Sequence, residues 1–257
     1  MLLAIDSGNT NIVFAVFGND GKIRTQWRSS TDGNRTADEF GIWLEQLMQL
    51  ANLNRENISS AIISTVVPAN LYTLKTLCKK YFQCDPLIIG EPGIELGINI
   101  EIDRPDDVGA DRLVNTVSAH QRYGGPLIIV DFGTATTFDV VGSDGSYQGG
   151  IIAPGVNLSL EALHRAAARL PRIAVERPER IVGKGTIPAM QSGIFWGYIG
   201  LIEGLVFRIR KEYENEMPVI ATGGLSPLFA RSTDVIEKTD EELTLKGLYT
   251  IYQLNSK

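Results

Sequence analysis

The apolar positions divide the chain into two halves that begin in the same way. In residues 2–17, isoleucine, valine and phenylalanine form two apolar runs that are interrupted at Gly8, and the turn sequence Asn19-Asp20-Gly21 follows. Runs rich in β-branched and aromatic residues and bounded by turn residues are typical of strands. We therefore predict a hairpin in residues 2–17 and a third strand at 23–28.

Helical periodicity begins at Thr36, after which large apolar residues recur three or four positions apart as far as Leu50. The β-branched run at 61–67 predicts a buried strand that Pro68 closes. The same criteria predict helices at 71–82 and 111–123 and a short strand at 87–90. The sequence Gly124-Gly125-Pro126 is a candidate domain boundary.

Beyond that boundary the opening pattern returns. Residues 127–134, Leu-Ile-Ile-Val-Asp-Phe-Gly-Thr, repeat the character of residues 2–9, with Asp131 lying 125 residues after Asp6. A strand at 136–141 and the turn Asp144-Gly145 complete a second hairpin. We predict two lobes of related construction, residues 1–124 and 125–257.

A long helix is predicted at 187–214, and its glycines 193, 197, 200 and 204 fall on or near one face. Each glycine destabilises a helix by about 1 kcal/mol relative to alanine, so we expect close packing against another element. Glu203 and Arg208 interrupt its apolar run, which is shorter than the roughly 20 residues that a bilayer requires. The helix is therefore predicted to be buried or to face another subunit.

Composition narrows the classes of partner. The chain has 24 basic and 30 acidic residues, a net charge of −6, and hence no basic field that would attract nucleic acid or an anionic membrane. With 44% hydrophobic residues it has the profile of a globular protein. Asp6 follows the first apolar residues without a charged leader, which predicts a cytoplasmic protein rather than a secreted one.

The two repeated turns are the strongest candidates for chemistry. Each strand ends in Asp-x-Gly, where exposed backbone N–H groups can bind an anion and glycine lets a phosphate approach. Asp6 and Asp131 suit a phosphate only if a cation such as Mg²⁺ lies between them. One such turn is equally consistent with an ordinary hairpin, whereas two matched copies favour phosphate binding. A third glycine element, residues 222–224, follows the apolar strand at 219–221 and is a candidate site for a base or ribose.

In order and type, these three elements resemble the phosphate 1, phosphate 2 and adenosine motifs of the actin, sugar kinase and Hsp70 superfamily. The resemblance implies an α/β fold of two ribonuclease H-like lobes with an ATP cleft between them. Four further segments resemble type III pantothenate kinases: Val-Gly-Ala-Asp-Arg at 108–112, Asp-Phe-Gly-Thr-Ala-Thr-Thr at 131–137, Gly-Gly-Ile-Ile-Ala-Pro-Gly at 149–155 and Ala-Met-Gln-Ser-Gly at 189–193.

That family resemblance implies ATP-dependent phosphorylation of pantothenate to 4'-phosphopantothenate, the first step of coenzyme A biosynthesis. It makes Asp111 the base toward the pantothenate hydroxyl and Asp131 a ligand of a monovalent cation, K⁺ or NH₄⁺. Mg²⁺ accompanies ATP, with Asp6 as its candidate ligand, and a homodimer carries the substrate site at its interface. The implied substrate contacts are Gly109, Ala110, Asp111, Arg112 and Thr186, and the implied ATP contacts are Asp6, Ser7, Gly8, Asn9, Thr10, Asn11, Ile12, Val13, Gly133, Thr134, Gly223 and Gly224.

Several alternatives stay open on the residues alone. Asp111 also suits the first turn of a helix, where a negative charge is stabilising by up to ~1 kcal/mol. The chain departs from the family it resembles at Ile102, where many relatives carry a tyrosine that contacts the substrate, so the part that this position plays in pantothenate binding stays open. A non-catalytic ATP-binding regulator, an actin-like filament protein and a kinase acting on another small hydroxyl substrate share the ATP motifs.

Overall fold

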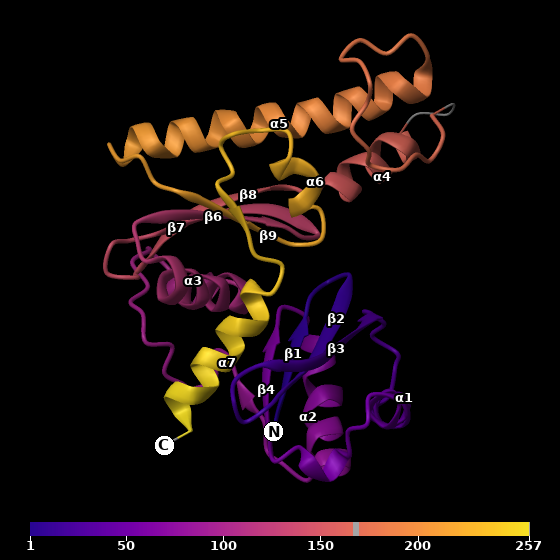
Figure 1. Cartoon of the computed structure of the whole chain (residues 1–257), viewed down its shortest axis with the longest axis vertical. Helices are drawn as coiled ribbons and strands as arrows, with labels where there is room; N and C mark the ends of the chain where they lie inside the picture. Colours follow the sequence, from indigo (N-terminus) through magenta and orange to yellow (C-terminus); the bar gives the residue numbers. More distant parts are fainter. Residues whose placement is uncertain (167–169, 257) are drawn as a thin grey trace. The chain divides into compact units, whose positions relative to one another are not determined.

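The computed structural model describes residues 1–166 and 170–256, which form two five-stranded sheets with their helices (Figure 1). The contacts divide the chain into two compact units. The first comprises Met1–Ile98, Arg104–Ser118 and the C-terminal segment from Leu243, and the second comprises Asn99–Asp103 and Ala119–Glu242. The units differ from the predicted division at residue 124 chiefly in the last helix, which packs with the first unit because its apolar face covers the first sheet.

The first sheet confirms the predicted hairpin and third strand. Its strand order is β3-β2-β1-β4-β5, in which β1, β2 and β3 are antiparallel neighbours and β4 and β5 continue parallel to β1. The strands are β1 (Leu2–Ser7), β2 (Asn11–Phe17), β3 (Ile23–Ser30), β4 (Ser60–Thr65) and β5 (Leu87–Ile88). The β4 strand ends before Pro68, and β5 is shorter than predicted.

Both faces of this sheet are covered, which explains the nearly continuous apolar runs of β1 and β4. Leu3 and Ile5 pack under α1 (Ala37–Leu50) and α2 (Pro68–Phe82). Leu2 and Ala4 point the other way, toward α7 (Leu243–Asn255) and the first part of α3 (Ala110–Tyr123). Two 3₁₀ helices, η1 (Arg55–Asn57) and η2 (Pro105–Asp107), complete the unit.

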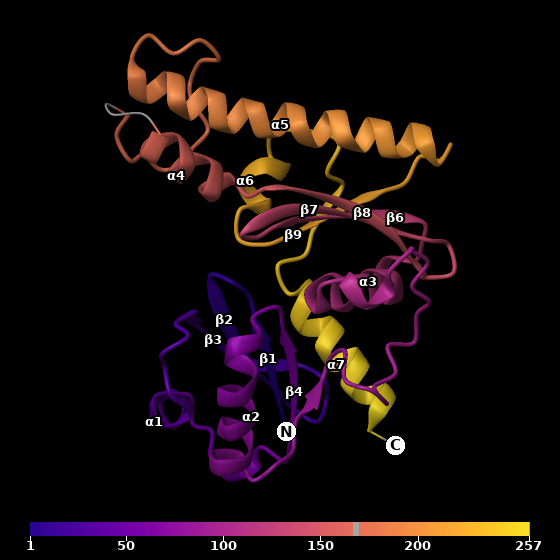
Figure 2. The same cartoon turned by 180° about the vertical axis from the view of Figure 1, so that it is seen from behind.

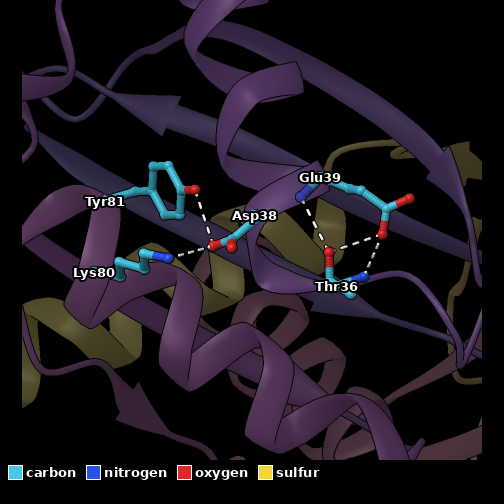
Figure 3. Close-up of polar contacts among 5 residues, drawn as sticks. All are labelled: Thr36, Asp38, Glu39, Lys80 and Tyr81. Atoms are coloured by element: carbon cyan, nitrogen blue, oxygen red, sulfur yellow. Dashed lines mark hydrogen bonds and ion pairs between the residues drawn. The ribbon is translucent and has the colours of Figure 1, made fainter.

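Local signals determine where α1 and α2 begin. The Thr36 side chain accepts a hydrogen bond from the Glu39 backbone N–H, and the Glu39 carboxylate accepts one from the Thr36 N–H, so α1 starts with a capping box (Figure 3). Asp38 accepts hydrogen bonds from Lys80 and Tyr81 of α2, which join the two helices. Helix α2 begins at Pro68, earlier than predicted, because proline suits the first helical position.

The second sheet has the same order and the same strand directions, β8-β7-β6-β9-β10, which confirms the internal repeat. Three helices cover one face of it in both views: α4 (Val156–Ala166), α5 (Thr186–Glu212) and α6 (Ser226–Ala230) (Figures 1 and 2). Its strands are β6 (Leu127–Phe132), β7 (Ala135–Val141), β8 (Tyr147–Pro154), β9 (Val219–Thr222) and β10 (Lys238–Thr239).

The sequence predicts close packing against the glycines of α5, and the structure differs within the described residues. Apart from the nearby backbone of the helix itself, added Cβ atoms at Gly193, Gly197 and Gly200 would meet no atom within 4 Å, so no other element of the described residues packs closely there. Phe207 continues this row and is 67% exposed. The helix is long and apolar enough to cross a membrane by length and composition, and 39% of its most apolar window is buried within the chain. One face of α5 therefore packs on the second sheet while the glycine face is open.

A close helix contact in the first unit predicts a stability loss. A Cβ added at Gly247 of α7 would lie 2.3 Å from the Val114 carbonyl oxygen of α3, so Gly247→Ala must push the two helices apart. Overpacking destabilises by about 1–3 kcal/mol, more than the ~1 kcal/mol that alanine gains in a helix. We expect a lower thermal midpoint by calorimetry. Gly33→Ala, where an added Cβ meets nothing within 4 Å, is the control, and an equal midpoint in both variants would contradict the prediction.

Candidate active site

The turn between β1 and β2 is held from several directions. The Gly8 N–H donates to the Asn11 carbonyl at 3.0 Å, and the Ser7 carbonyl accepts from the Val66 N–H at 3.1 Å. The Ser7 hydroxyl is fully buried and accepts a hydrogen bond from the Asn70 side chain of α2 at 3.1 Å. Ile12 is also buried in the core, so Ser7 and Ile12 can present only backbone groups to a ligand, whereas Asn9 and Thr10 are exposed.

Asp6 and Asp111, distant in the sequence, interact in the first unit. Burial and the nearby Asp111 carboxylate raise the pKa of Asp6 to about 7, and the Ser64 hydroxyl and the Arg28 guanidinium oppose that rise. Ser64 lies opposite Asp6 because β1 and β4 run parallel in register. The opening turn and the Gly-Ala-Asp-Arg segment therefore place two carboxylates within electrostatic reach of each other.

Asp111 is the second residue of α3 and is only partly exposed. Its Oδ1 accepts a hydrogen bond from the Arg112 backbone N–H at 2.8 Å and lies 2.6 Å from where a Cβ at Gly109 would be, so Gly109 leaves room for the carboxylate. Burial raises the pKa of Asp111, although the Arg112 N–H and charge oppose it. Its place in the first helical turn agrees with a carboxylate that stabilises the start of the helix. Its raised pKa and its proximity to Asp6 suit a proton acceptor.

In the second unit, the second phosphate turn and the adenosine element meet. Asp131 and Thr222 lie opposite each other in the β6–β9 register. A Cβ at Gly223 would lie 2.6 Å from the Phe132 carbonyl and 2.8 Å from the Asp131 carboxylate, and Gly223 has φ +86°. Only glycine fits there without strain. The Gly133 N–H donates to the Ala135 carbonyl at 3.0 Å, much as Gly8 does in the first turn.

Thr186 lies at the first position of α5, where it lines a pocket of about 450 Å³ in the second unit. The other walls come from α4, from a residue shortly after α4 and from α5, and they are mostly apolar: Leu163, Leu170, Ala189, Met190, Gly193 and Ile194. An apolar pocket with a few polar groups is the usual form of a small-molecule site.

Comparison with known proteins identifies the family of the chain. The model of the type III pantothenate kinase family matches residues 2–208. A type III pantothenate kinase of Paramagnetospirillum magneticum is 63% identical over 100% of this chain and 98% of its own length. One of Rhodospirillum rubrum is 61% identical over 99% of both chains.

The chain belongs to the type III pantothenate kinase family. Among solved structures, a putative 2-dehydro-3-deoxygalactonokinase of Sinorhizobium meliloti superposes with a TM-score of 0.61 at 13% identity, covering 99% of this chain and 96% of that one. Both lobes thus have the actin, sugar kinase and Hsp70 type of fold, and both resemblances inferred from the motifs are confirmed.

Four residues that affect Asp6 or hold the first phosphate turn could not be predicted from the sequence. Ser64 and Arg28 lower the pKa of Asp6. Asn70 and Thr31 hold the turn between β1 and β2 through hydrogen bonds. No local motif marks them, because each comes from a neighbouring strand, helix or loop. The parallel pairing of β1 with β4 is the only signal that could have identified Ser64. Ile102 lies near Gly149 in the second unit, where an added Cβ would be 3.6 Å from its Cγ2.

The acidic site of the first unit fits a magnesium ion that retains water and phosphate ligands. Asp6 and Asp111 repel each other as anions, and a divalent cation beside Asp6 would relieve this repulsion. The described residues contain no group of three or more histidine, cysteine, aspartate or glutamate side chains arranged around one point. Mg²⁺ commonly binds to one or two carboxylates together with substrate phosphates, which agrees with so few protein ligands.

Proposed function

We propose that this protein transfers the γ-phosphoryl group of ATP to pantothenate, giving 4'-phosphopantothenate at the entry to coenzyme A biosynthesis. Membership of the type III pantothenate kinase family supports the reaction. The site assignment rests on the nearness of two carboxylates: the charge of Asp111 helps to raise the pKa of Asp6 in the opening turn.

In this proposal Asp111 orients the primary hydroxyl of pantothenate and accepts its proton. A raised pKa makes a carboxylate a stronger base, which suits a proton acceptor working near neutral pH. Gly109, Ala110, Arg112 and Thr186 bind the substrate, and the planar Arg112 guanidinium suits its carboxylate. Positioning and charge neutralisation then supply most of the catalysis.

ATP is bound, in the same proposal, by the two repeated turns and the third glycine element. Asp6 is the candidate Mg²⁺ ligand, and Asp131 binds a monovalent cation, K⁺ or NH₄⁺. Bound Mg²⁺ would neutralise charge that develops on the phosphates. The ATP contacts are Asp6 to Val13, Gly133, Thr134, Gly223 and Gly224. A cytoplasmic location, predicted from the sequence, belongs to the same proposal.

The test of this function is an acceptor screen with purified protein, ATP, Mg²⁺ and K⁺. We expect ATP-dependent phosphorylation of pantothenate, and lower activity when Na⁺ replaces K⁺. ATP binding without turnover of any acceptor would favour a regulator, and turnover of another hydroxyl substrate would favour a different kinase. Light scattering that rises on addition of ATP would favour a filament.

We further propose a homodimer in which a second copy covers the glycine face of α5. Exposed Phe207 and the open row at Gly193, Gly197 and Gly200 form an apolar surface without a close partner among the described residues. A helix backbone that lacks side chains lets another helix approach closely, which compensates for the low helix propensity of glycine. The Thr186 pocket lies at one end of the same helix, in keeping with a substrate site near an interface.

Gly200→Arg should therefore give a monomer. Gly200 is exposed and a Cβ added there would meet nothing within 4 Å among the described residues, so the fold is expected to persist while the dimer loses its close contact. Light scattering after size exclusion measures the mass of the wild type and the variant. Glu212→Arg, at the exposed end of α5, is the matched control. A dimer of unchanged affinity in Gly200→Arg would contradict this interface.

A further inference from the structure

Thr31 directly follows β3 and contacts the first phosphate turn twice. Its hydroxyl donates to the Gly8 carbonyl at 2.6 Å, and its backbone N–H donates to the Thr10 carbonyl at 2.9 Å. The side chain is partly buried. The backbone bond continues the β2–β3 pairing, whereas the side-chain bond is an addition that a strand pair does not require.

These two bonds determine where the amides of the turn point. A trans peptide unit is planar, and its C=O and N–H point in opposite directions. When Thr31 holds the Gly8 and Thr10 carbonyls, the N–H groups of Asn9 and Asn11 are directed away from Thr31. Asn9 and Asn11 are exposed. Thr31 thus orients two donors of a turn whose proposed role is to bind phosphate oxygens.

At the equivalent position of the second sheet, the phosphate turn is contacted by a residue without a side chain. Gly155 directly follows β8, as Thr31 follows β3, and β8 pairs with β7 as β3 pairs with β2. A Cβ at Gly155 would lie 2.1 Å from the Thr134 carbonyl and 2.9 Å from the Gly133 carbonyl. Any side chain would displace the second phosphate turn, so the turn packs directly against the Gly155 α-carbon.

We propose that the residue after the third strand of each sheet is a positioning residue for that sheet's phosphate turn. Thr31 acts through two hydrogen bonds, and Gly155 acts by leaving room for the turn. The inference rests on the proposed function, in which both turns hold the phosphates of ATP. It adds two residues that are not among the proposed contacts to pantothenate or ATP.

The test compares Thr31→Val, which removes the hydroxyl and keeps the shape, with Thr31→Ser, which keeps a donor. Thr25→Val is the matched control, because Thr25 is partly buried in β3 and lies away from the turn. We expect Thr31→Val to raise the KM for ATP about tenfold, the effect of one lost hydrogen bond, with the KM for pantothenate within about twofold. Thr31→Ser should restore most of the ATP affinity, and Thr25→Val should match the wild type.

A purely structural role for Thr31 predicts a different result: a lower thermal midpoint and equal changes in both KM values. That result, or wild-type ATP affinity in Thr31→Val, would overturn the inference while pantothenate phosphorylation by the wild type stands. Failure of the wild type to bind Mg²⁺-ATP by calorimetry would overturn the proposed function and the inference with it. For Gly155→Ala we expect a rise in the KM for ATP at least as large as for Thr31→Val. If that variant does not fold, the Thr31 series decides.

Discussion

Asp111→Asn is expected to lower kcat for pantothenate phosphorylation by about 10²–10⁴-fold, the usual contribution of a general base. Asparagine keeps the size of the side chain and can still accept a hydrogen bond from the Arg112 N–H, but it cannot take the hydroxyl proton. The KM for ATP should change little, because Asp111 is assigned to the acceptor and not to the nucleotide. Steady-state kinetics with each substrate varied in turn measure both quantities.

The control for Asp111→Asn is Asp106→Asn, which removes an exposed carboxylate from the neighbouring η2 helix. It should behave as the wild type. Circular dichroism and thermal unfolding establish that both variants fold. If Asp111→Asn retained more than about a tenth of the wild-type kcat, a role as general base would be untenable, and the charge would be assigned to the start of α3 instead.

Asp6→Asn should have opposite effects on activity and stability. The folded protein holds a proton on Asp6 up to its raised pKa of about 7, whereas an unfolded chain releases it near the ordinary aspartate pKa of 3.8. Stability should therefore fall as pH rises from about 4 to 7, with the full penalty present above pH 7. Asparagine cannot ionise, so the metal-free variant should unfold at a higher temperature than the wild type at pH 8. The difference should shrink toward pH 5.

Catalysis should change in the other direction. Without the Asp6 carboxylate the site loses its candidate Mg²⁺ ligand, and we expect kcat/KM for ATP to fall at least ~10²-fold. Thermal unfolding in EDTA across pH 5–8, followed by titration with Mg²⁺-ATP, separates the two effects, because a ligand that binds the folded state raises its stability. Asp20→Asn, at an exposed aspartate in the β2–β3 turn, controls for loss of charge. A variant less stable than the wild type at pH 8 would contradict the buried charge.

Much of the site could be predicted because it consists of short, contiguous segments. Asp-x-Gly at the end of an apolar strand, repeated 125 residues later, identifies two turns without knowledge of the fold. The capping residue Thr36 and Pro68 mark helix starts through contacts within a few positions. The predicted start of α2 is late because the apolar spacing begins only after the proline.

The amino-acid sequence by itself determined both hairpins, the helices α1, α2, α3 and α5, the internal repeat and the family, since these depend on residue period and on short motifs. It did not predict the strands β8 and β10 or the helices α4, α6 and α7. Only the tertiary structure decided that Asp6 and Asp111 share one site, because β1 and α3 meet through packing of the first sheet. It also decided that the α5 glycines face outward and that Thr31 and Gly155 support the turns. These contacts join residues far apart in the chain, and no local pattern encodes a distance between them.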